Sequence, residues 1–150
     1  MLIGSSKTWL CVLLLASALG VGLSLYSLLH HYAFTSGSFC TINSTFDCDV
    51  VNRGPFSELF GIPVSFLGVM GYGFMHLIGW ALYRQPKDRL LHLLLVATVV
   101  PALLFSFYLT GIEAFVLHAW CLLCITSQIS MLFIAFAMAR WSLPTLRSSV

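Results

Sequence analysis

The chain has 150 residues, of which 59% are hydrophobic and only 8% are charged, and its formal net charge is +2. Soluble domains usually carry about 25% charged residues, so this composition excludes a water-soluble globule and a disordered chain. The seven Lys and Arg residues are scattered and form no basic patch, which excludes a nucleic-acid-binding protein. We therefore expect an integral membrane protein with one small domain, residues 1–150.

Four stretches are long and apolar enough to cross a lipid bilayer as helices. A span needs about 20 mostly apolar residues, and none of the four contains Lys, Arg, Asp or Glu. Helices are expected because a backbone in lipid must satisfy its own hydrogen bonds, and the alternation typical of transmembrane strands is absent. The sequence thus predicts an all-α bundle with four transmembrane helices. In chain order the predicted spans are Thr8–Tyr32, Pro63–Tyr83, Leu90–Gly111 and Trp120–Ala139.

The first stretch has a second interpretation, as a cleaved signal peptide. Lys7, the apolar run and the sequence Ala16-Ser17-Ala18 together imitate such a peptide and its cleavage site. The apolar run continues to Leu29, however, which is longer than the apolar region of a signal peptide. We therefore predict a retained first helix.

The basic residues predict the orientation of the chain in the membrane. With the N-terminus in the cytoplasm, six of the seven Lys and Arg residues lie inside and only Arg53 lies outside. The outer side then holds one long loop, residues 33–62, and a short connection, Ile112–Ala119. Within the loop, Pro55–Phe60 has apolar residues at helical spacing, which predicts a short helix on the membrane surface. This helix is either a simple anchor or a lid over a cavity among the spans.

Four of the five cysteines fall on the predicted outer side. Cys40 and Cys48 lie in the long loop, and Cys121 and Cys124 form a Cys-x-x-Cys pair where the fourth helix begins. The topology therefore places these four thiols in one oxidising compartment, on two separate segments. Cys11 lies near the opposite end and is expected to be a small buried apolar residue.

A Cys-x-x-Cys pair at a helix N-terminus favours redox chemistry. Residues three apart share a helix face, and the helix dipole favours the thiolate form of Cys121. Cys124 lies about one turn deeper, so one thiol faces disulfides from the water and the other faces a reactant dissolved in lipid. A static disulfide between the two would close a very small loop and stabilise little. A zinc site is disfavoured because Cys40 and Cys48 are too far apart for the usual zinc-binding spacing, so we predict no metal.

Three features of the sequence together resemble those of a known family. They are the cysteine pair of the outer loop, the segment Phe60-Gly61-Ile62-Pro63-Val64-Ser65-Phe66-Leu67-Gly68 and the segment Trp120-Cys121-Leu122-Leu123-Cys124-Ile125-Thr126. Over nearly the whole chain, they resemble the vitamin K epoxide reductase family, and its prokaryotic branch in particular. The resemblance implies a four-helix bundle around a quinone, capped by the outer loop. It also implies that electrons pass from a thioredoxin-like partner to the loop cysteines, then to the Cys-x-x-Cys pair, and then to the quinone.

The resemblance also implies a role for each of the four cysteines. Cys40 would exchange with the partner, Cys48 would react with Cys121, and Cys124 would meet the quinone, of ubiquinone, menaquinone or vitamin K type. Many prokaryotic members carry a fused thioredoxin-like domain. This sequence has none, so we expect a DsbA-like partner in trans.

Further residues are candidates for contact with the quinone or for proton transfer. Ser65 could bond the quinone or cap a helix, and Trp120 could stack on it or belong to the interfacial aromatic belt. Gln128 stands where vertebrate members have a tyrosine that helps to hold the quinone, and its amide can donate a hydrogen bond. Phe60 is a fourth candidate contact. His118 is a candidate proton relay, although an interfacial histidine is often only solvated.

These residues predict a membrane thiol:quinone oxidoreductase that supports disulfide formation. The nearest alternative is the reduction of vitamin K epoxide or quinone by the same cysteines, and a remote one is a non-catalytic membrane scaffold with static disulfides. We expect a bacterial inner membrane with the cysteines on the periplasmic or extracellular side. The alternative is an endoplasmic reticulum membrane with lumenal cysteines, but there the sequon Asn43-Ser44-Thr45 would place a glycan between two redox cysteines.

Overall fold

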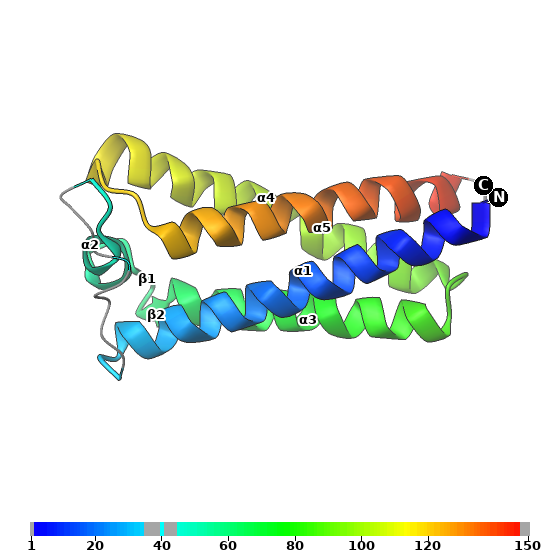
Figure 1. Cartoon of the computed structure of the whole chain (residues 1–150), viewed down its shortest axis with the longest axis horizontal. Helices are drawn as coiled ribbons and strands as arrows, with labels where there is room; N and C mark the ends of the chain where they lie inside the picture. Colours follow the sequence, from blue (N-terminus) through cyan, green and yellow to red (C-terminus); the bar gives the residue numbers. More distant parts are fainter. Residues whose placement is uncertain (1, 35–39, 41–44, 148–150) are drawn as a thin grey trace.

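The computed structural model describes residues 2–34, 40 and 45–147 of the chain. Four long helices run side by side: α1 (Leu2–His31), α3 (Val64–Arg84), α4 (Arg89–Ile112) and α5 (Leu122–Arg147) (Figure 1). Each contains a segment long and apolar enough to cross a membrane. The predicted all-α bundle with four transmembrane helices is confirmed.

The two ends of the bundle differ in what they carry. Both chain termini and the α3–α4 connection lie at one end, which we call the termini end, and the segment between α1 and α3 lies at the other, the loop end (Figure 1). Arg84 and Arg89, at adjoining ends of α3 and α4, belong to the termini end, whereas Arg53 belongs to the loop end. The basic residues therefore gather away from the loop, as the positive-inside pattern requires.

The core of the bundle is built mainly around α1, which packs against α3 and α5. Leu13, Leu82 and Leu95 are fully buried near the termini end. Gly20 allows close approach of two helices, because a Cβ atom there would lie 2.4 Å from the ring of Tyr72. The first helix thus supplies part of the core of the bundle.

The short α4–α5 connection contains more helix than the sequence predicted. A π-helix, η1 (Glu113–Leu117), continues α4 and ends at His118, which adopts a left-handed conformation with φ 50°. The predicted connection Ile112–Ala119 is therefore mostly helical, and Glu113 lies on helical backbone at the end of a span.

The described part of the outer loop contains a short helix, but not where it was predicted. Helix α2 covers Cys48–Arg53 and begins where the Asp47 carboxylate accepts hydrogen bonds from the N–H groups of Asp49 and Val50. The sequon residues 43 and 44 lie outside the described residues.

The predicted helix over Pro55–Phe60 is wrong, because this region leads into a hairpin. Strands β1 (Glu58–Leu59) and β2 (Ile62–Pro63) pair in antiparallel fashion. The two residues between them, Phe60 and Gly61, both have positive φ, 54° and 80°, as the favoured two-residue hairpin turn requires. The apolar residues of this segment are therefore spaced as in a helix, although the segment forms none.

Candidate redox site

Main-chain hydrogen bonds hold the outer loop against the start of α5. The N–H of Trp120 donates to the carbonyl of Thr45 over 2.8 Å, and the N–H of Asp47 donates to the carbonyl of Trp120 over 3.1 Å. Phe46 and Trp120 are thereby paired in a parallel β-bridge, which we call the 46–120 bridge. Since a cysteine directly follows each bonded segment, the bridge brings Cys48 next to Cys121.

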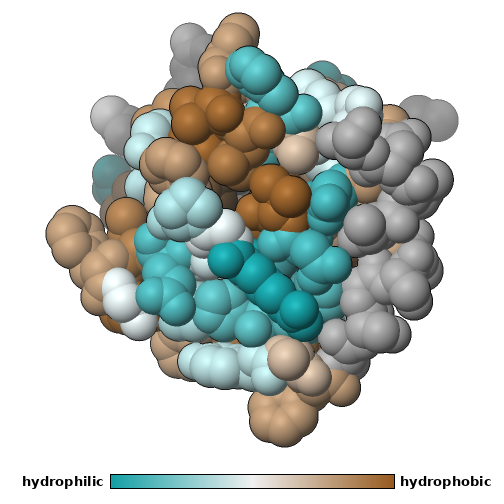
Figure 2. Space-filling model, turned by 90° about the vertical axis from the view of Figure 1, so that its left-hand side faces the viewer, coloured by the Kyte–Doolittle hydropathy of each residue, from teal (hydrophilic) through white to brown (hydrophobic). Residues whose placement is uncertain are grey.

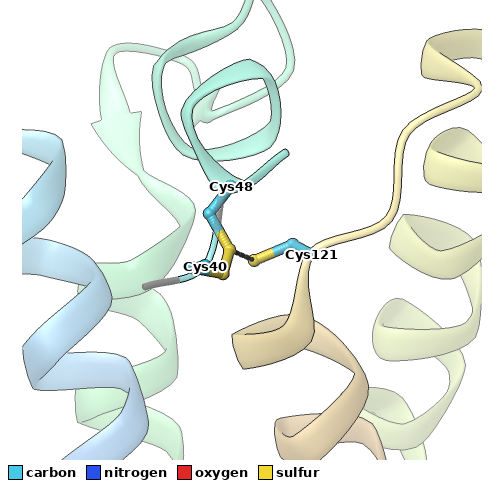
Figure 3. A group of neighbouring side chains, drawn as sticks. All are labelled: Cys40, Cys48 and Cys121. Carbon is cyan, nitrogen blue, oxygen red and sulfur yellow. Dashed lines mark hydrogen bonds between the residues drawn. A yellow bond between two sulfur atoms is a disulfide. The ribbon is translucent and has the colours of Figure 1, made fainter. Parts of the chain in front are cut away.

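Three of the four outer cysteines meet in a buried cluster (Figure 3). Cys40 and Cys48 form a disulfide, with their Cα atoms 5.6 Å apart. The Sγ atom of Cys121 lies 2.9 Å from the Sγ atom of Cys48, across 73 positions of sequence. A thiolate at this distance is placed for exchange with the disulfide, which proceeds by attack of sulfur on sulfur.

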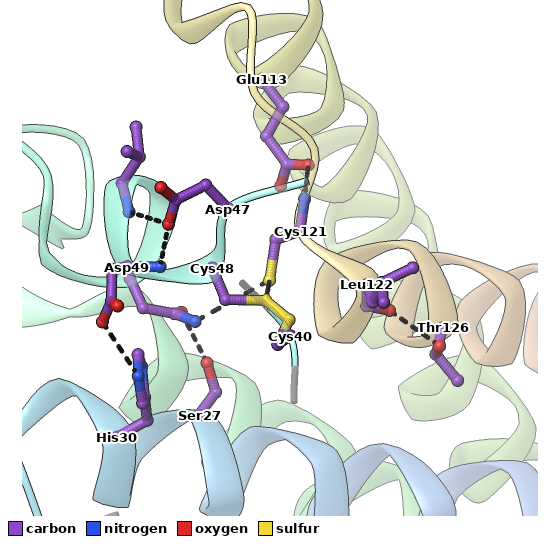
Figure 4. The surroundings of a disulfide bond; sticks show 12 residues. Ser27, His30, Cys40, Asp47, Cys48, Asp49, Glu113, Cys121, Leu122 and Thr126 are labelled. Carbon is purple, nitrogen blue, oxygen red and sulfur yellow. Dashed lines mark hydrogen bonds and ion pairs between the residues drawn. A yellow bond between two sulfur atoms is a disulfide. The ribbon is translucent and has the colours of Figure 1, made fainter. Parts of the chain in front are cut away.

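Polar side chains from α1 and α2 surround this cluster (Figure 4). The Ser27 hydroxyl donates to Asn52 Oδ1 over 2.6 Å, and this bond directs the Asn52 amide nitrogen toward Cys121 Sγ, 3.8 Å away. Nearby, His30 Nε2 lies 3.1 Å from a carboxylate oxygen of Asp49. Asn52 therefore offers a donor to the sulfur that would carry negative charge during exchange.

Cys121 has features of a reactive thiol. The hydrogen bond with the Cys124 side chain lowers the pKa of Cys121 below the ordinary value of a thiol. Burial of the sulfur and the neighbouring Glu113 carboxyl oppose this effect, while the N–H groups of Cys124 and Leu123 at the start of α5 reinforce it. The fraction of thiolate is therefore higher than in an unperturbed cysteine at the same pH.

A largely apolar cavity lies among the four long helices on the loop-end side of the bundle. Its lining includes Cys124, so the second thiol of the Cys-x-x-Cys pair faces it while the first contacts the disulfide. Polar side chains interrupt the apolar walls at several positions. Ser106 donates to Gln128 Oε1, which leaves the buried Nε2 of Gln128 without a partner among the described residues. Ligand pockets typically combine such apolar walls with a few directed polar groups.

Comparison with known families agrees with this arrangement of cysteines and cavity. The vitamin K epoxide reductase family model matches residues 11–139, a range that begins inside α1 and ends inside α5. The chain belongs to the vitamin K epoxide reductase family. It is therefore a redox enzyme of the membrane, from a family that works with quinones and with thioredoxin-like partners. The chain matches no curated protein sequence.

Against this family background, the structure brings only some of the predicted quinone contacts to the cavity. Ser65, in the first turn of α3, and Gln128, one turn beyond Cys124 on α5, both line it. Phe60 does not, because it occupies the tip of the hairpin turn and is 98% exposed. Trp120 is half-buried outside the lining and contributes through its backbone. His118 is exposed, and its Nδ1 lies 3.2 Å from the carbonyl oxygen of Ala114.

Sequence analysis missed Glu113 and Asn52 as members of the site. Glu113 is only 5% exposed, and its carboxylate accepts a hydrogen bond from the Cys121 N–H over 3.3 Å (Figure 4). A signal for Glu113 was present, since an acidic residue bordering a transmembrane span calls for a functional reason. Asn52 had no comparable signal, because the fold of the loop alone directs it to Cys121.

The sulfur atoms of Cys40, Cys48 and Cys121 lie within 4.8 Å of one another, close enough to share a metal ion. Two of them are bonded in the disulfide, which leaves Cys121 as the one thiolate ligand of this group in the oxidised state. Structural zinc sites need four protein ligands, so this group supports exchange between sulfurs better than metal binding.

Proposed function

We propose that this protein is a thiol:quinone oxidoreductase that reoxidises a DsbA-like, thioredoxin-fold partner in trans and passes the electrons to a quinone. The observation that carries the proposal is the 2.9 Å contact between Cys48 and Cys121. It joins a disulfide on the outer loop to a dithiol whose second member, Cys124, lines the cavity. The net result in the cell would be the formation of disulfide bonds.

The proposed electron path uses two dithiol–disulfide exchanges. A thiolate of the reduced partner attacks Cys40 and frees Cys48, and the second partner thiol then releases the oxidised partner with a disulfide of its own. The Cys48 thiolate next attacks Cys121 in a Cys121–Cys124 disulfide, and Cys40 closes again on Cys48. This restores the outer disulfide and leaves both inner cysteines reduced, which is the state of the cysteines in the structure.

The last step transfers two electrons and two protons to the quinone. Cys121 and Cys124 become a disulfide as the quinone becomes a quinol, so the cycle balances. Gln128 supports a quinone in the cavity, because its unpartnered Nε2 is a hydrogen-bond donor at membrane depth. Ser65 offers a second polar group on the α3 side of the same cavity. The quinone supplies the redox chemistry, and the protein holds the quinone in position beside the Cys124 thiol.

The distribution of charge supports a location of the disulfide on the outer side of a cell membrane. The basic termini end would face the cytoplasm, and the loop end would face the periplasm or the exterior of a bacterium. Hydrophilic residues gather across the middle of the loop end (Figure 2). Partly exposed charged side chains there include Asp49 and Arg53. Such a surface suits contact with a water-soluble protein better than contact with lipid.

The test is turnover by the purified protein in detergent with a reduced DsbA-like protein and either a short-chain ubiquinone analogue or menadione. Quinone absorbance and partner thiols are followed together. We expect equal amounts of quinone reduced and partner oxidised. Cys124→Ala should abolish quinone reduction, because the thiol facing the cavity is lost. Cys11→Ala is the matched control and should keep full activity, because Cys11 lies on α1 away from the site. The expectation that Cys11 is buried is wrong, since its side chain is exposed on the bundle.

Three results would contradict the proposal. Full activity of Cys124→Ala would remove the assigned electron donor to the quinone. Absence of turnover with either quinone, while vitamin K epoxide is reduced by the same preparation, would establish the alternative acceptor. A wild-type protein without any redox turnover would leave a scaffold with static disulfides as the better account.

A further inference from the structure

We propose that Glu113 is a catalytic acid–base residue that carries the proton of the Cys124 thiol to an oxygen of the bound quinone. The inference rests on the proposed function and adds a group to its last step. Its basis is the position of one buried carboxyl group between the Cys-x-x-Cys pair and the cavity.

Three contacts define this position. The Glu113 carboxyl group lies near the Cys124 thiol and interacts with it. One of its oxygens accepts the N–H of Cys121 over 3.3 Å. The side chain also lines the cavity, as Cys124 does. A group that touches the thiol and borders the quinone space meets the geometric condition for a general acid–base catalyst.

The surroundings of Glu113 give it no structural partner of opposite charge. Among the described residues, none of the three ion pairs involves Glu113, although the side chain is only 5% exposed. Burying a carboxylate without a cation is costly, so a merely structural role would be served better by an amide or an apolar residue. A buried ionisable group at the edge of a span is by default a candidate functional group.

Few other ionisable groups come near Glu113. The ones that face it directly are the two thiols of the Cys-x-x-Cys pair. On α2, which contacts η1, Asp49 and Arg53 are paired with each other and with His30. The remaining ionisable residues of α4, which leads into η1, are Arg89 and His92 at the termini end and Tyr108, which is 59% exposed. On α3, Tyr72 lines the same cavity as Cys124, and its hydroxyl is bonded to Ser127. An ionisation in the quinone step is therefore assigned to Glu113 by its loss in Glu113→Gln.

The proton transfers balance with the electron transfers. The Glu113 carboxylate takes the proton of the Cys124 thiol as that sulfur gives its electrons to the quinone, and then donates the proton to the quinone oxygen that has gained negative charge. The electron pair given by Cys124 forms a bond between its sulfur and the quinone. Cys121 then attacks the Cys124 sulfur, so that the disulfide bond forms, the bond from sulfur to the quinone breaks, and the electron pair stays with the quinol that leaves. The thiol proton of Cys121 passes to solvent at the loop end, and the quinol takes its second proton from solvent. Glu113 ends the cycle as a carboxylate again.

The test isolates the quinone step in a single turnover. The enzyme is fully reduced with dithiothreitol, freed of reductant and mixed with a short-chain ubiquinone analogue, and quinone absorbance is followed across a range of pH. The variant is Glu113→Gln, whose amide oxygen still accepts the Cys121 N–H but whose side chain carries no proton to release. The matched control is Glu58→Gln, the same change at a half-exposed residue on the hairpin.

We expect Glu113→Gln to slow quinone reduction by about 10²- to 10⁴-fold, the range typical of a lost acid–base catalyst. It should also lose one ionisation from the pH profile of the wild type, and Glu113→Asp should recover part of the rate. Glu58→Gln should behave as the wild type. Exchange between Cys48 and Cys121, measured separately by trapping with a thiol reagent, should stay normal in Glu113→Gln and so report an intact site.

Each other outcome overturns the inference in a distinct way. If Glu113→Gln reduces quinone at the wild-type rate, Glu113 carries no proton in this step. If the rate falls but the pH profile keeps its shape, Glu113 is a positioning residue only. If the wild type itself reduces no quinone in this assay, the proposed function fails and the role of Glu113 fails with it.

Discussion

At the termini end of the bundle, His92 is fully buried and both of its ring nitrogens have partners, Ser142 Oγ at 2.9 Å and the Pro86 carbonyl at 3.0 Å. At the loop end, Gln128 has its amide oxygen bonded, whereas its buried amide nitrogen has no partner among the described residues. A carbonyl only accepts, so His92 Nε2 carries a proton and Nδ1 accepts from Ser142. The polar groups of His92 are all bonded within the fold, whereas Gln128 keeps one donor unbonded among the described residues.

The same contrast holds for apolar packing along α4. Leu95 lies in the first half of the helix and is fully buried, while Leu109 lies near its other end, lines the cavity and is half-buried. Leu95 thus belongs to a close-packed region of the bundle, whereas Leu109 belongs to the wall of the cavity. The comparison separates residues that stabilise the bundle from residues that shape its binding space.

The largest expected difference comes from truncating these two leucines. Leu95→Ala should lower the free energy of unfolding by about 2–5 kcal/mol, because it leaves a cavity in a packed core. Leu109→Ala should cost less than half of that, because part of its side chain already faces empty space. Denaturant unfolding of the detergent-solubilised protein, followed by circular dichroism, measures both. Equal losses would mean that the two ends are packed alike.

A smaller difference is expected for the two polar residues. His92→Leu should cost about 1–3 kcal/mol of stability, because it leaves the Ser142 hydroxyl and the Pro86 carbonyl unpaired. Gln128→Leu should change stability by less than 1 kcal/mol and instead raise the KM for quinone several-fold, as the loss of one hydrogen bond implies. The unfolding assay and quinone titrations give the two numbers. An unchanged KM in Gln128→Leu would remove that residue from the quinone site.

The smallest expected effect is a shift in the pH at which Cys121 loses its proton, and two substitutions of Cys124 test it. Cys124→Ser keeps a hydrogen-bond donor beside Cys121, whereas Cys124→Ala removes the largest cause of the lowered pKa of Cys121. The thiolate of Cys121 should then form at higher pH in Cys124→Ala than in Cys124→Ser. Attack of Cys121 on Cys48 releases the Cys40 thiol, which a fluorescent maleimide detects. The pH at which half of this thiol is released should be higher in Cys124→Ala than in Cys124→Ser. Identical midpoints would contradict this cause.

The sequence was sufficient for those parts of the fold that depend on hydrophobicity and on charge counts. Runs free of charged residues predicted four helices, and their alternating direction predicted that all four outer cysteines share one end. The sequence was insufficient where local backbone geometry determines which element forms. The apolar spacing over Pro55–Phe60 is equally compatible with the observed hairpin, since the positive φ angles of Phe60 and Gly61 are a property of the turn.

The chemical details of the site were likewise beyond the sequence. Four cysteines allow three pairings, and the sequence left the resting disulfide open, whereas the fold pairs Cys40 with Cys48. The fold also places Cys121 beside Cys48, the two cysteines that the family resemblance implies react with each other. Glu113 was not predicted as a member of the site, and its carboxylate reaches the N–H of Cys121 from the π-helix that continues α4. Both features depend on contacts between segments far apart in the chain.

The 46–120 bridge has a consequence for how freely this protein can vary. Its two hydrogen bonds use only backbone atoms, so they hold whatever side chains positions 46 and 120 carry. Position 120 must provide an N–H, so proline is the one residue that the bridge forbids there. Other substitutions at these two positions should therefore leave the distance between the sulfur atoms of Cys48 and Cys121 unchanged. The surface residues at the loop end can therefore change while the contact between Cys48 and Cys121 is kept.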